Sequence, residues 1–196
     1  MKGERRFLIA FSYLWHWYLL IMAVCVGLGV LASYLARTPR YEECIYVFIA
    51  SATCDSRRLE SDLLNVHYSD PRIKAISIDH SNPDDFYFPM VFSTRGSVNT
   101  DIIILPKGYF GEESYPAYFS LLSDSVAEYV PTYGSLKKAE FEGKAYGIEA
   151  NSISSRYGFS AGDYSLFFNK NSKKNAKLNS FGENNVALEA IGALYA

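Results

Sequence analysis

The chain has 196 residues, 19 of them basic and 21 acidic, and its formal net charge is −2. That length accommodates one domain and a spare segment, and the spare segment is the uncharged beginning of the chain. The part that follows Arg40 has 14 basic and 20 acidic residues, so its charge is near −6. This balance excludes a basic nucleic-acid surface, and no nucleic-acid partner is expected.

A long apolar stretch comes first in the chain. Residues 7–36 contain no Asp, Glu, Lys or Arg, and a bilayer core needs about 20 apolar residues. Aromatic residues stand at both ends of the stretch, as they do at membrane interfaces: Trp15, Trp17, Tyr18 and Tyr34. We therefore predict a transmembrane helix over 14–36, and a buried core helix is the alternative.

The same stretch has to be distinguished from a cleaved signal peptide. Cleavage before Arg37 would place Tyr34 at the −3 position, which requires a small residue. The prediction is therefore an uncleaved signal anchor. Its basic flanks are Lys2, Arg5 and Arg6 before the span and Arg37 and Arg40 after it.

The acidic residues Glu42 and Glu43 follow the second basic flank at once. The positive-inside rule then predicts a cytoplasmic segment over 1–13 and an extracellular domain over 41–196 of a single-pass protein in the cell membrane. Cys44 and Cys54 are too far apart to bond to each other if a strand separates them. A bacterial surface protein without a disulfide framework is the simplest setting.

The domain begins with alternating strand and helix signals. Short apolar runs predict buried strands over 44–50, 73–79 and 100–106. A helix with Asp55 or Thr53 as its N-cap is expected after the first strand, and an aromatic-rich helix after the second. This β-α-β-α-β order predicts an α/β fold with a parallel sheet and right-handed crossovers.

The rest of the domain predicts further elements that flank this sheet or extend its edge. Residues 116–130 have apolar positions near helical spacing, and 184–195 predicts a final helix. Strands are expected over 141–150, with a turn at Glu142 and Gly143, and over 163–170. The resulting fold class is α/β, with a parallel (mixed-edge) sheet flanked by helices.

Polar residues follow two of the predicted buried strands. Ligands of open α/β sheets bind beyond the carboxyl ends of the strands, which directs attention to Ser51, Thr53 and Asp55 after the first strand and to Pro106 and Lys107 after the third. Hydroxyls and helix-start amides in the first loop suit a polar ligand. Ordinary helix capping requires the same residue types and is the alternative.

Enzyme signatures are weak. The sequence has no G-x-S-x-G elbow, P-loop or H-E-x-x-H motif. Cys54 at a helix start, where the dipole lowers thiol pKa, and His67 and His80, with Asp79 beside the latter, are the residues on which a hydrolase hypothesis would rest. We expect no enzyme activity, no cofactor and no metal.

Four short segments together resemble extracellular solute-binding proteins of ABC transporters, which have the periplasmic-binding-protein fold. EGKAYGI (142–148) resembles the family's short "GK-x-YG-I/L" turn and strand, and YSLFFNK (164–170) its "Y-x-x-x-x-N-K" pattern. TDIIILP (100–106) resembles the third strand of the first lobe, and CIYVFIAS (44–51) its first strand. The resemblance covers about residues 44–178 and lies in the order and spacing of the segments.

The resemblance implies a solute-binding lobe whose ligand residues are Ser51, Thr53, Asp55, Pro106, Lys107 and Tyr146. Tyr146 would offer a stacking face for a small polar solute, which would be a sugar, an amino acid or a peptide. The alternative for Tyr146 is core packing on the sheet. The soluble length is about half that of two-lobed members, and Glu149 replaces the family's usual Pro. The expectation is one lobe that acts as an accessory to an ABC-type membrane transporter.

A different function class stays open beside it. FYFPMVF (86–92) and SYPAYF (114–119) are dense in aromatic residues, which are enriched at protein interfaces. The alternative is a non-catalytic protein–protein interaction module whose partner is another surface protein, unless these rings belong to the core.

Overall fold

The computed structural model describes residues 2–37 and 39–196, with side chains over 14–34 and 39–196. It has two compact units, Met1–Arg40 and Tyr41–Ala196. The first is helix α1 (Lys2–Arg37), in which Leu14–Tyr34 is exposed and has a mean hydropathy of 2.0. This helix is long and apolar enough to cross a membrane, a property that a signal sequence shares. The predicted basic flank at Lys2, Arg5, Arg6 and Arg37 lies outside the described side chains.

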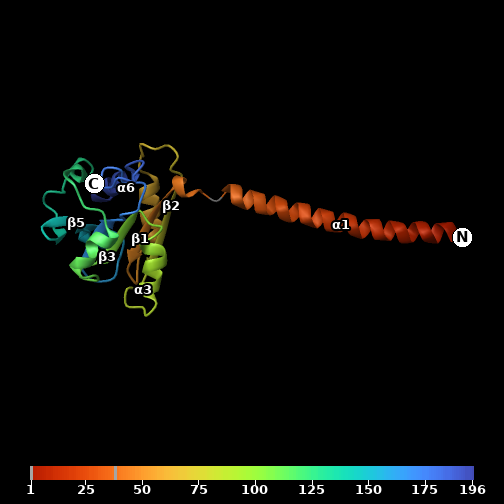
Figure 1. Cartoon of the computed structure of the whole chain (residues 1–196), viewed down its shortest axis with the longest axis horizontal. Helices are drawn as coiled ribbons and strands as arrows, with labels where there is room; N and C mark the ends of the chain where they lie inside the picture. Colours follow the sequence, from red (N-terminus) through yellow and green to blue (C-terminus); the bar gives the residue numbers. More distant parts are fainter. Residues whose placement is uncertain (1, 38) are drawn as a thin grey trace. The chain divides into compact units, whose positions relative to one another are not determined.

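The second unit is built on one six-stranded sheet (Figure 1). Its strands are β1 (Cys44–Ala50), β2 (Ala75–Ser81), β3 (Ile102–Pro106), β4 (Lys138–Phe141), β5 (Lys144–Glu149) and β6 (Tyr164–Phe168), in the order β2-β1-β3-β6-β5-β4. β1 is parallel to β2 and β3, whereas the β3–β6, β6–β5 and β5–β4 pairs are antiparallel. The α/β class is confirmed, with a sheet that is mixed through half of its width.

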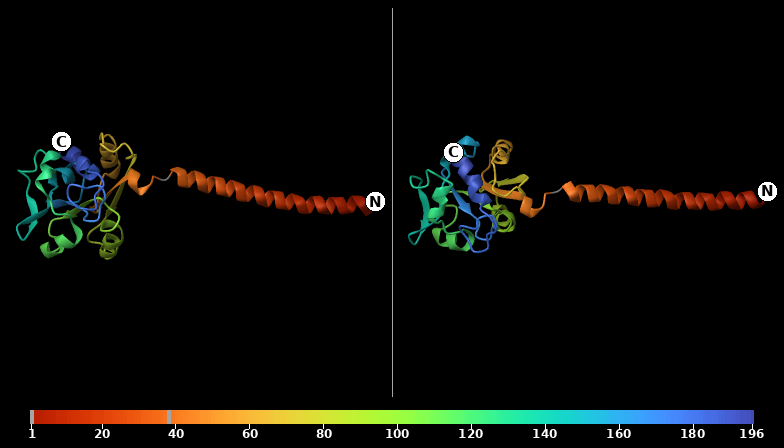
Figure 2. Two further views of the ribbon diagram at one scale, coloured as in Figure 1. Left: turned by 45° about the horizontal axis from the view of Figure 1, so that its top comes forward. Right: turned by 90° about the horizontal axis from the view of Figure 1, so that it is seen from above.

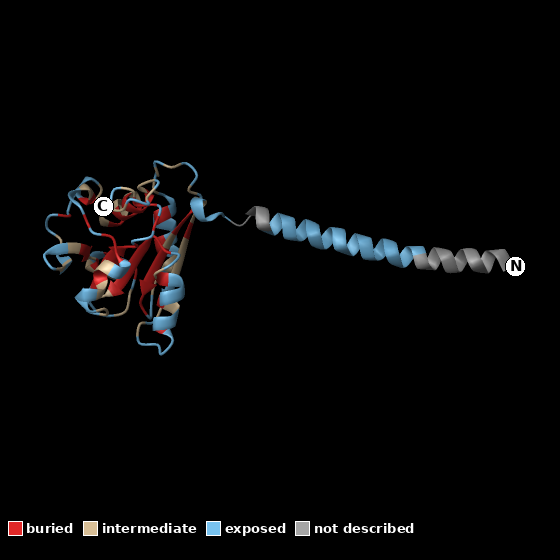
Figure 3. Ribbon diagram, viewed as in Figure 1, coloured by how far each residue is buried: buried red, intermediate tan, exposed pale blue. Residues whose placement is uncertain are grey.

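Helices cover both faces of the sheet (Figure 2). One face packs against α2 (Ser56–Leu64), η4 (Asp124–Glu128), α5 (Asn151–Arg156) and α6 (Val186–Tyr195). The other packs against α3 (Phe88–Val91), the π-helical turn η2 (Phe92–Gly96) and α4 (Tyr115–Tyr118), which follows η3 (Glu112–Ser114). The inner strands β1, β3 and β6 are almost entirely buried (Figure 3), as burial on two faces requires, whereas the edge strands β2 and β4 are partly exposed.

Local signals explain several of these elements. The Asp55 carboxylate caps α2 by accepting a hydrogen bond from the Arg58 N–H at 3.1 Å, as predicted. Glu142 and Gly143 both have positive φ, 52° and 71°, which is the backbone that a two-residue hairpin turn needs. The predicted turn at Glu142 and Gly143 is confirmed, and the predicted stretch 141–150 contains the last residue of β4, this turn and all of β5.

Two predicted elements differ in the structure. The second strand begins two residues later than predicted, because Ile73 closes a turn onto Asp70 and Lys74 N–H binds the Glu43 carbonyl, which belongs to η1 (Tyr41–Glu43). The predicted helix over 116–130 is wrong. Its apolar residues pack on both faces of the sheet. Phe119 packs on Phe167 on one face, while Leu122, Val126 and Val130 pack on the other. The chain extends at Phe119 to cross between them.

A buried ion pair connects several segments at the amino edge of the sheet, where β1 and β3 begin. The Lys174 ammonium donates to Asp101 Oδ2 at 3.0 Å, and both side chains are almost fully buried. Asp101 also accepts from the Tyr46 N–H at 2.9 Å and the Ser172 hydroxyl at 2.6 Å. The Tyr41 ring covers the ammonium at 4.1 Å. This cluster joins β1, the start of β3 and the segment after β6.

Candidate functional site

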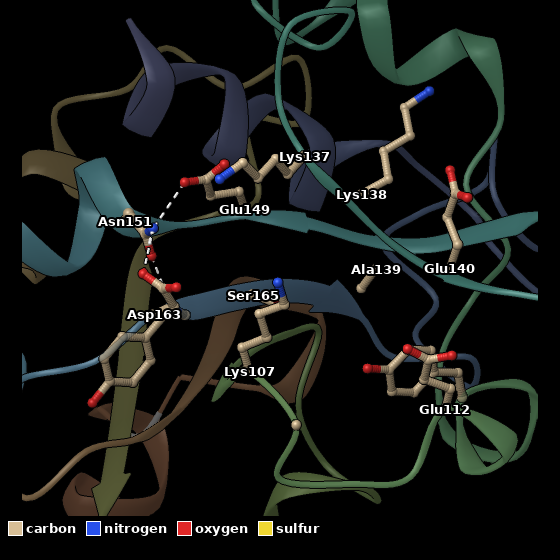
Figure 4. Close-up of a pocket in the computed structure, with 13 residues that line it drawn as sticks. Lys107, Glu112, Lys137, Lys138, Ala139, Glu140, Glu149, Asn151, Asp163 and Ser165 are labelled. Atoms are coloured by element: carbon tan, nitrogen blue, oxygen red, sulfur yellow. Dashed lines mark hydrogen bonds between the residues drawn. The ribbon is translucent and has the colours of Figure 1, made fainter.

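A hollow of about 390 Å³ opens at the carboxyl edge of the sheet, where β3 ends and its antiparallel neighbour β6 begins. We call it the edge pocket. Its lining residues come from the segment after β3, from β4 and β5, and from the start of β6: Lys107, Gly108, Glu112, Tyr115, Lys137, Lys138, Ala139, Glu140, Glu149, Asn151, Asp163, Tyr164 and Ser165 (Figure 4). It lies at the kind of edge where α/β sheets bind ligands.

A row of cross-strand neighbours forms part of the lining. Glu149 of β5 lies opposite Ser165 of β6, and the Glu149 N–H donates to the Lys137 carbonyl next to it at 2.8 Å. Ser165 is itself paired with Leu105 of β3. Neighbours of this kind are separated by about 5 Å, so Lys137, Glu149 and Ser165 are held side by side by the sheet itself.

Lys107 is held next to Asp163 at the pocket by the backbone. Its N–H donates to the Asp163 carbonyl at 2.8 Å, which continues the β3–β6 pairing one step beyond the strands. The side chain of Lys107 points into the pocket toward β6, and the carboxylates of Glu149 and Asp163 gather on one side of it (Figure 4).

Asn151 joins those two carboxylates. Its side-chain nitrogen donates to Glu149 Oε1 at 2.8 Å and to Asp163 Oδ1 at 2.9 Å. Its oxygen accepts from the Tyr164 N–H at 2.9 Å, which sets the orientation of the amide. The two acidic groups are therefore held near one point by a neutral side chain.

The charged side chains around the edge pocket do not form close ion pairs in the described structure. Within the described part of the chain, none of its lysines or carboxylates takes part in an ion pair: Lys107, Lys137, Lys138, Glu112, Glu140, Glu149 and Asp163. Lys138 instead lies over the Tyr133 ring, 4.6 Å from its centroid. Groups of both signs are thus present and available at one site.

The predicted loop after β1 lies next to this pocket and is held by its own contacts. Ser51 is fully buried, and its hydroxyl donates to the Thr53 carbonyl at 2.7 Å and meets the Ser160 hydroxyl at 2.9 Å. Thr53 donates to the Gly158 carbonyl at 3.0 Å. The Tyr164 hydroxyl reaches Ser51 at 3.3 Å and so connects the loop with the pocket.

The remaining predicted residues are divided between two places. Pro106 ends β3, and Lys107, which follows it, lines the edge pocket. Tyr146 is only 8% exposed, and its ring packs against Tyr115 with centroids 6.3 Å apart. It borders a second hollow beside Phe181 rather than the edge pocket. The six predicted residues therefore do not form one group.

The hydrolase hypothesis involves Cys54, His67, Asp79 and His80, and of these Asp79 and His80 lie in β2 toward the carboxyl edge. Burial raises the pKa of the Cys54 thiol to about 11, the reverse of the lowering that a helix start predicts. His67 follows the end of α2, and α2 returns the chain from the carboxyl edge to the amino edge. Asp79 contacts Arg95 at 3.3 Å. Among residues 2–37 and 39–196, no group of three His, Cys, Asp or Glu side chains is placed to hold a metal.

Sequence reasoning missed Glu149, Asn151, Asp163 and Ser165. They lie at the end of β5, just after it, and at the start of β6. The available signal was that polar residues end the apolar run YGIE (146–149) and begin the run DYSLFF (163–168). Comparison with protein-family models and with curated protein sequences found no match to this chain.

Proposed function

We propose that the chain is a membrane-anchored domain that binds a small polar solute in the edge pocket. The observation that carries the proposal is the set of lysines and carboxylates that surround one hollow without forming ion pairs in the described structure. Exposed charges of opposite sign tend to pair with each other or face bulk water. Here the sheet and Asn151 hold them around a cavity of a size typical for small ligands.

The sequence resemblance supports the same reading. The EGKAYGI segment forms the β4–β5 turn and most of β5, and the YSLFFNK segment begins with β6. Both therefore contribute to the strands that line the edge pocket. We propose a solute-binding-like lobe outside the cell, held by α1 in the membrane, that presents its solute to an ABC-type transporter.

A thermal-shift panel tests the proposal on the full-length chain in detergent micelles. Sugars, amino acids, peptides and oxyanions are added one class at a time. A ligand at 100 times its Kd stabilises the folded state by about 2.7 kcal/mol, which is a rise of about 5–10 °C in Tm for a domain of this size.

Matched variants locate the binding site. Lys107→Gln removes a pocket charge, and Lys144→Gln removes an exposed lysine at the β4–β5 turn. The shift should disappear in the first variant and persist in the second. A cooperative melt that no ligand class shifts would overturn the proposal.

A second function rests on exposed apolar residues before and within α3. Phe88 and Phe92 of the FYFPMVF segment are core residues, but Phe86 is 87% exposed, and Tyr87 and Met90 are also exposed. Neighbouring exposed apolar side chains indicate an interaction surface. In this alternative the domain binds another cell-surface protein there.

Cross-linking in native membranes distinguishes the two functions. A specific cross-linked partner should be lost when Phe86 and Met90 are both changed to Ser, and retained in Leu64→Ser, which alters an exposed leucine on α2. A chain that stays monomeric at high concentration and yields no cross-linked product would count against the interaction module.

A further inference from the structure

We infer that the solute of the edge pocket is a zwitterion, an amino acid or a short peptide, whose ammonium group binds at Glu149 and Asp163 and whose carboxylate binds at Lys107. The inference rests on the proposed function and names the ligand class of the same site. It follows from three features of the pocket: a preorganised acidic end, a basic end, and an unpartnered hydroxyl between strands.

The acidic end is built to receive a cation. Asn151 donates one hydrogen bond to each carboxylate, at 2.8 Å and 2.9 Å, and so holds Glu149 and Asp163 around a single nitrogen. Each carboxylate keeps a second oxygen with lone pairs for further donors. Two like charges that share one neutral donor repel each other, and an ammonium group placed between them would relieve this repulsion with charge-assisted hydrogen bonds.

The basic end is the side chain of Lys107. The Lys107 side chain points into the cavity, and the described residues provide it with no anionic partner. Lys137, the cross-strand neighbour of Glu149, adds a second positive charge to the same lining. A ligand carboxylate at the Lys107 ammonium would gain charge-assisted hydrogen bonds there.

Ser165 supplies a second, independent observation at the same pocket. The residue is 7% exposed and lines the edge pocket, yet its hydroxyl forms no hydrogen bond with another described residue. Buried polar side chains are nearly always hydrogen-bonded. Because no fully enclosed side-chain oxygen or nitrogen lacks a partner among the described residues, this hydroxyl keeps contact with the open space of the pocket. It is available to hydrogen-bond a polar group of a ligand.

Other small solutes fit the pocket less well. A neutral sugar would leave both sets of charges without counter-ions, and Tyr146, the residue predicted to stack on a sugar, packs into the core. An inorganic oxyanion would meet Glu149 and Asp163, and a simple cation would meet the lysines. A zwitterion satisfies both ends, and the cavity of about 390 Å³ has space for an amino acid or a dipeptide.

Calorimetric titration of the full-length chain in detergent micelles tests the inference. The ligands are L-alanine and glycylglycine, L-alaninamide, which lacks the carboxylate, and N-acetyl-L-alanine, which lacks the ammonium. Maltose and sulfate represent the competing classes. We expect a zwitterion to bind at least about tenfold more tightly than either analogue, because each analogue loses charge-assisted hydrogen bonds at one end.

Two variants assign the ends. In Asp163→Asn, the preference for L-alanine over N-acetyl-L-alanine should shrink, while the preference over L-alaninamide persists. In Lys107→Gln, the preference for L-alanine over L-alaninamide should shrink, while the preference over N-acetyl-L-alanine persists. Ser165→Ala should weaken zwitterion binding several-fold without changing either preference by as much, and Lys144→Gln should leave all affinities unchanged.

The outcomes separate this inference from the proposed function. If maltose or sulfate binds, loses its affinity in Lys107→Gln, and neither zwitterion binds, the pocket is a solute site but its ligand class is not the one inferred. If none of the six compounds binds, and the wider thermal-shift panel is also silent, both are overturned. If Asp163→Asn and Lys107→Gln each reduced both preferences equally, the assignment of the two ends would be contradicted.

Discussion

The buried ion pair at the amino edge gives the sharpest stability prediction. Lys174→Met replaces a buried ammonium with an apolar side chain of similar length and leaves the Asp101 carboxylate without its counter-ion. Both side chains are essentially inaccessible, with exposures of 3% and 0%. Water therefore cannot solvate the Asp101 carboxylate in the folded state, and we expect the folded state to be strongly destabilised.

The magnitude follows from the contacts that remain. Breaking a buried pair by removing one partner costs about 3–5 kcal/mol. Asp101 retains hydrogen bonds from the Tyr46 N–H and the Ser172 hydroxyl, which favours the lower part of that range. The lost contact between the ammonium and the Tyr41 ring adds about 0.5–1 kcal/mol. We predict a loss of about 3–4 kcal/mol in the free energy of unfolding.

Urea unfolding of the full-length chain in micelles, followed by tyrosine near-UV circular dichroism, measures this loss. The neighbouring Lys173→Met is the matched control, because Lys173 pairs with Glu183 at 3.0 Å on the surface. Exposed pairs of this kind contribute about 0–1 kcal/mol. Adding Asp101→Asn to Lys174→Met should restore part of the stability, because the remaining side chain is then neutral. Equal midpoints and slopes for Lys173→Met and Lys174→Met would refute the reasoning.

Three further predictions concern other parts of the domain. Gly147→Ala should cost about 1–3 kcal/mol in the same urea assay, because a Cβ there would lie 2.6 Å from the Phe167 ring; an unchanged midpoint would contradict the packing of β5 on β6. Cys54, whose pKa burial raises to about 11, should react with iodoacetamide at pH 8 about two orders of magnitude more slowly than free cysteine; peptide mass spectrometry would detect the opposite result. Hydrogen bonds from Arg72 lower the pKa of Asp70 from 3.8 to about 2, so the stability that this carboxylate contributes is present above about pH 4 and is lost as the pH falls through 2. Arg72→Gln should reduce that acid-dependent loss, and an identical pH profile would count against the link.

Much of the fold was predictable because its signals are local. β1, β3 and α2 begin and end where short apolar runs meet cap and turn residues, and Asp55 caps α2 as expected. The stretch over 116–130 was not predictable from spacing alone. Its apolar residues belong to two separate cores on opposite faces of the sheet. Helical spacing in the sequence does not indicate on which face each residue packs.

The candidate site was predictable only in part, for a reason of topology. Lys107 was found because it follows a buried strand, and the ends of parallel strands are the usual place to search. β6 runs antiparallel to β3, and β5 antiparallel to β6. The start of β6 and the end of β5 therefore come to the same edge and bring Asp163 and Glu149 beside Lys107. That arrangement depends on pairings between distant segments, which residue spacing does not reveal.

The central claim is that a small charged solute binds at the carboxyl edge of the sheet, and amide chemical-shift mapping tests its location directly. The full-length chain in micelles is titrated with L-alanine, and the backbone amide signals are followed by NMR. The account predicts changes that saturate together and cluster at Lys107, Asn151, Asp163 and Ser165. Changes centred on Phe86 or Phe181 would contradict this claim. So would the absence of changes at L-alanine concentrations that saturate a site with a millimolar Kd.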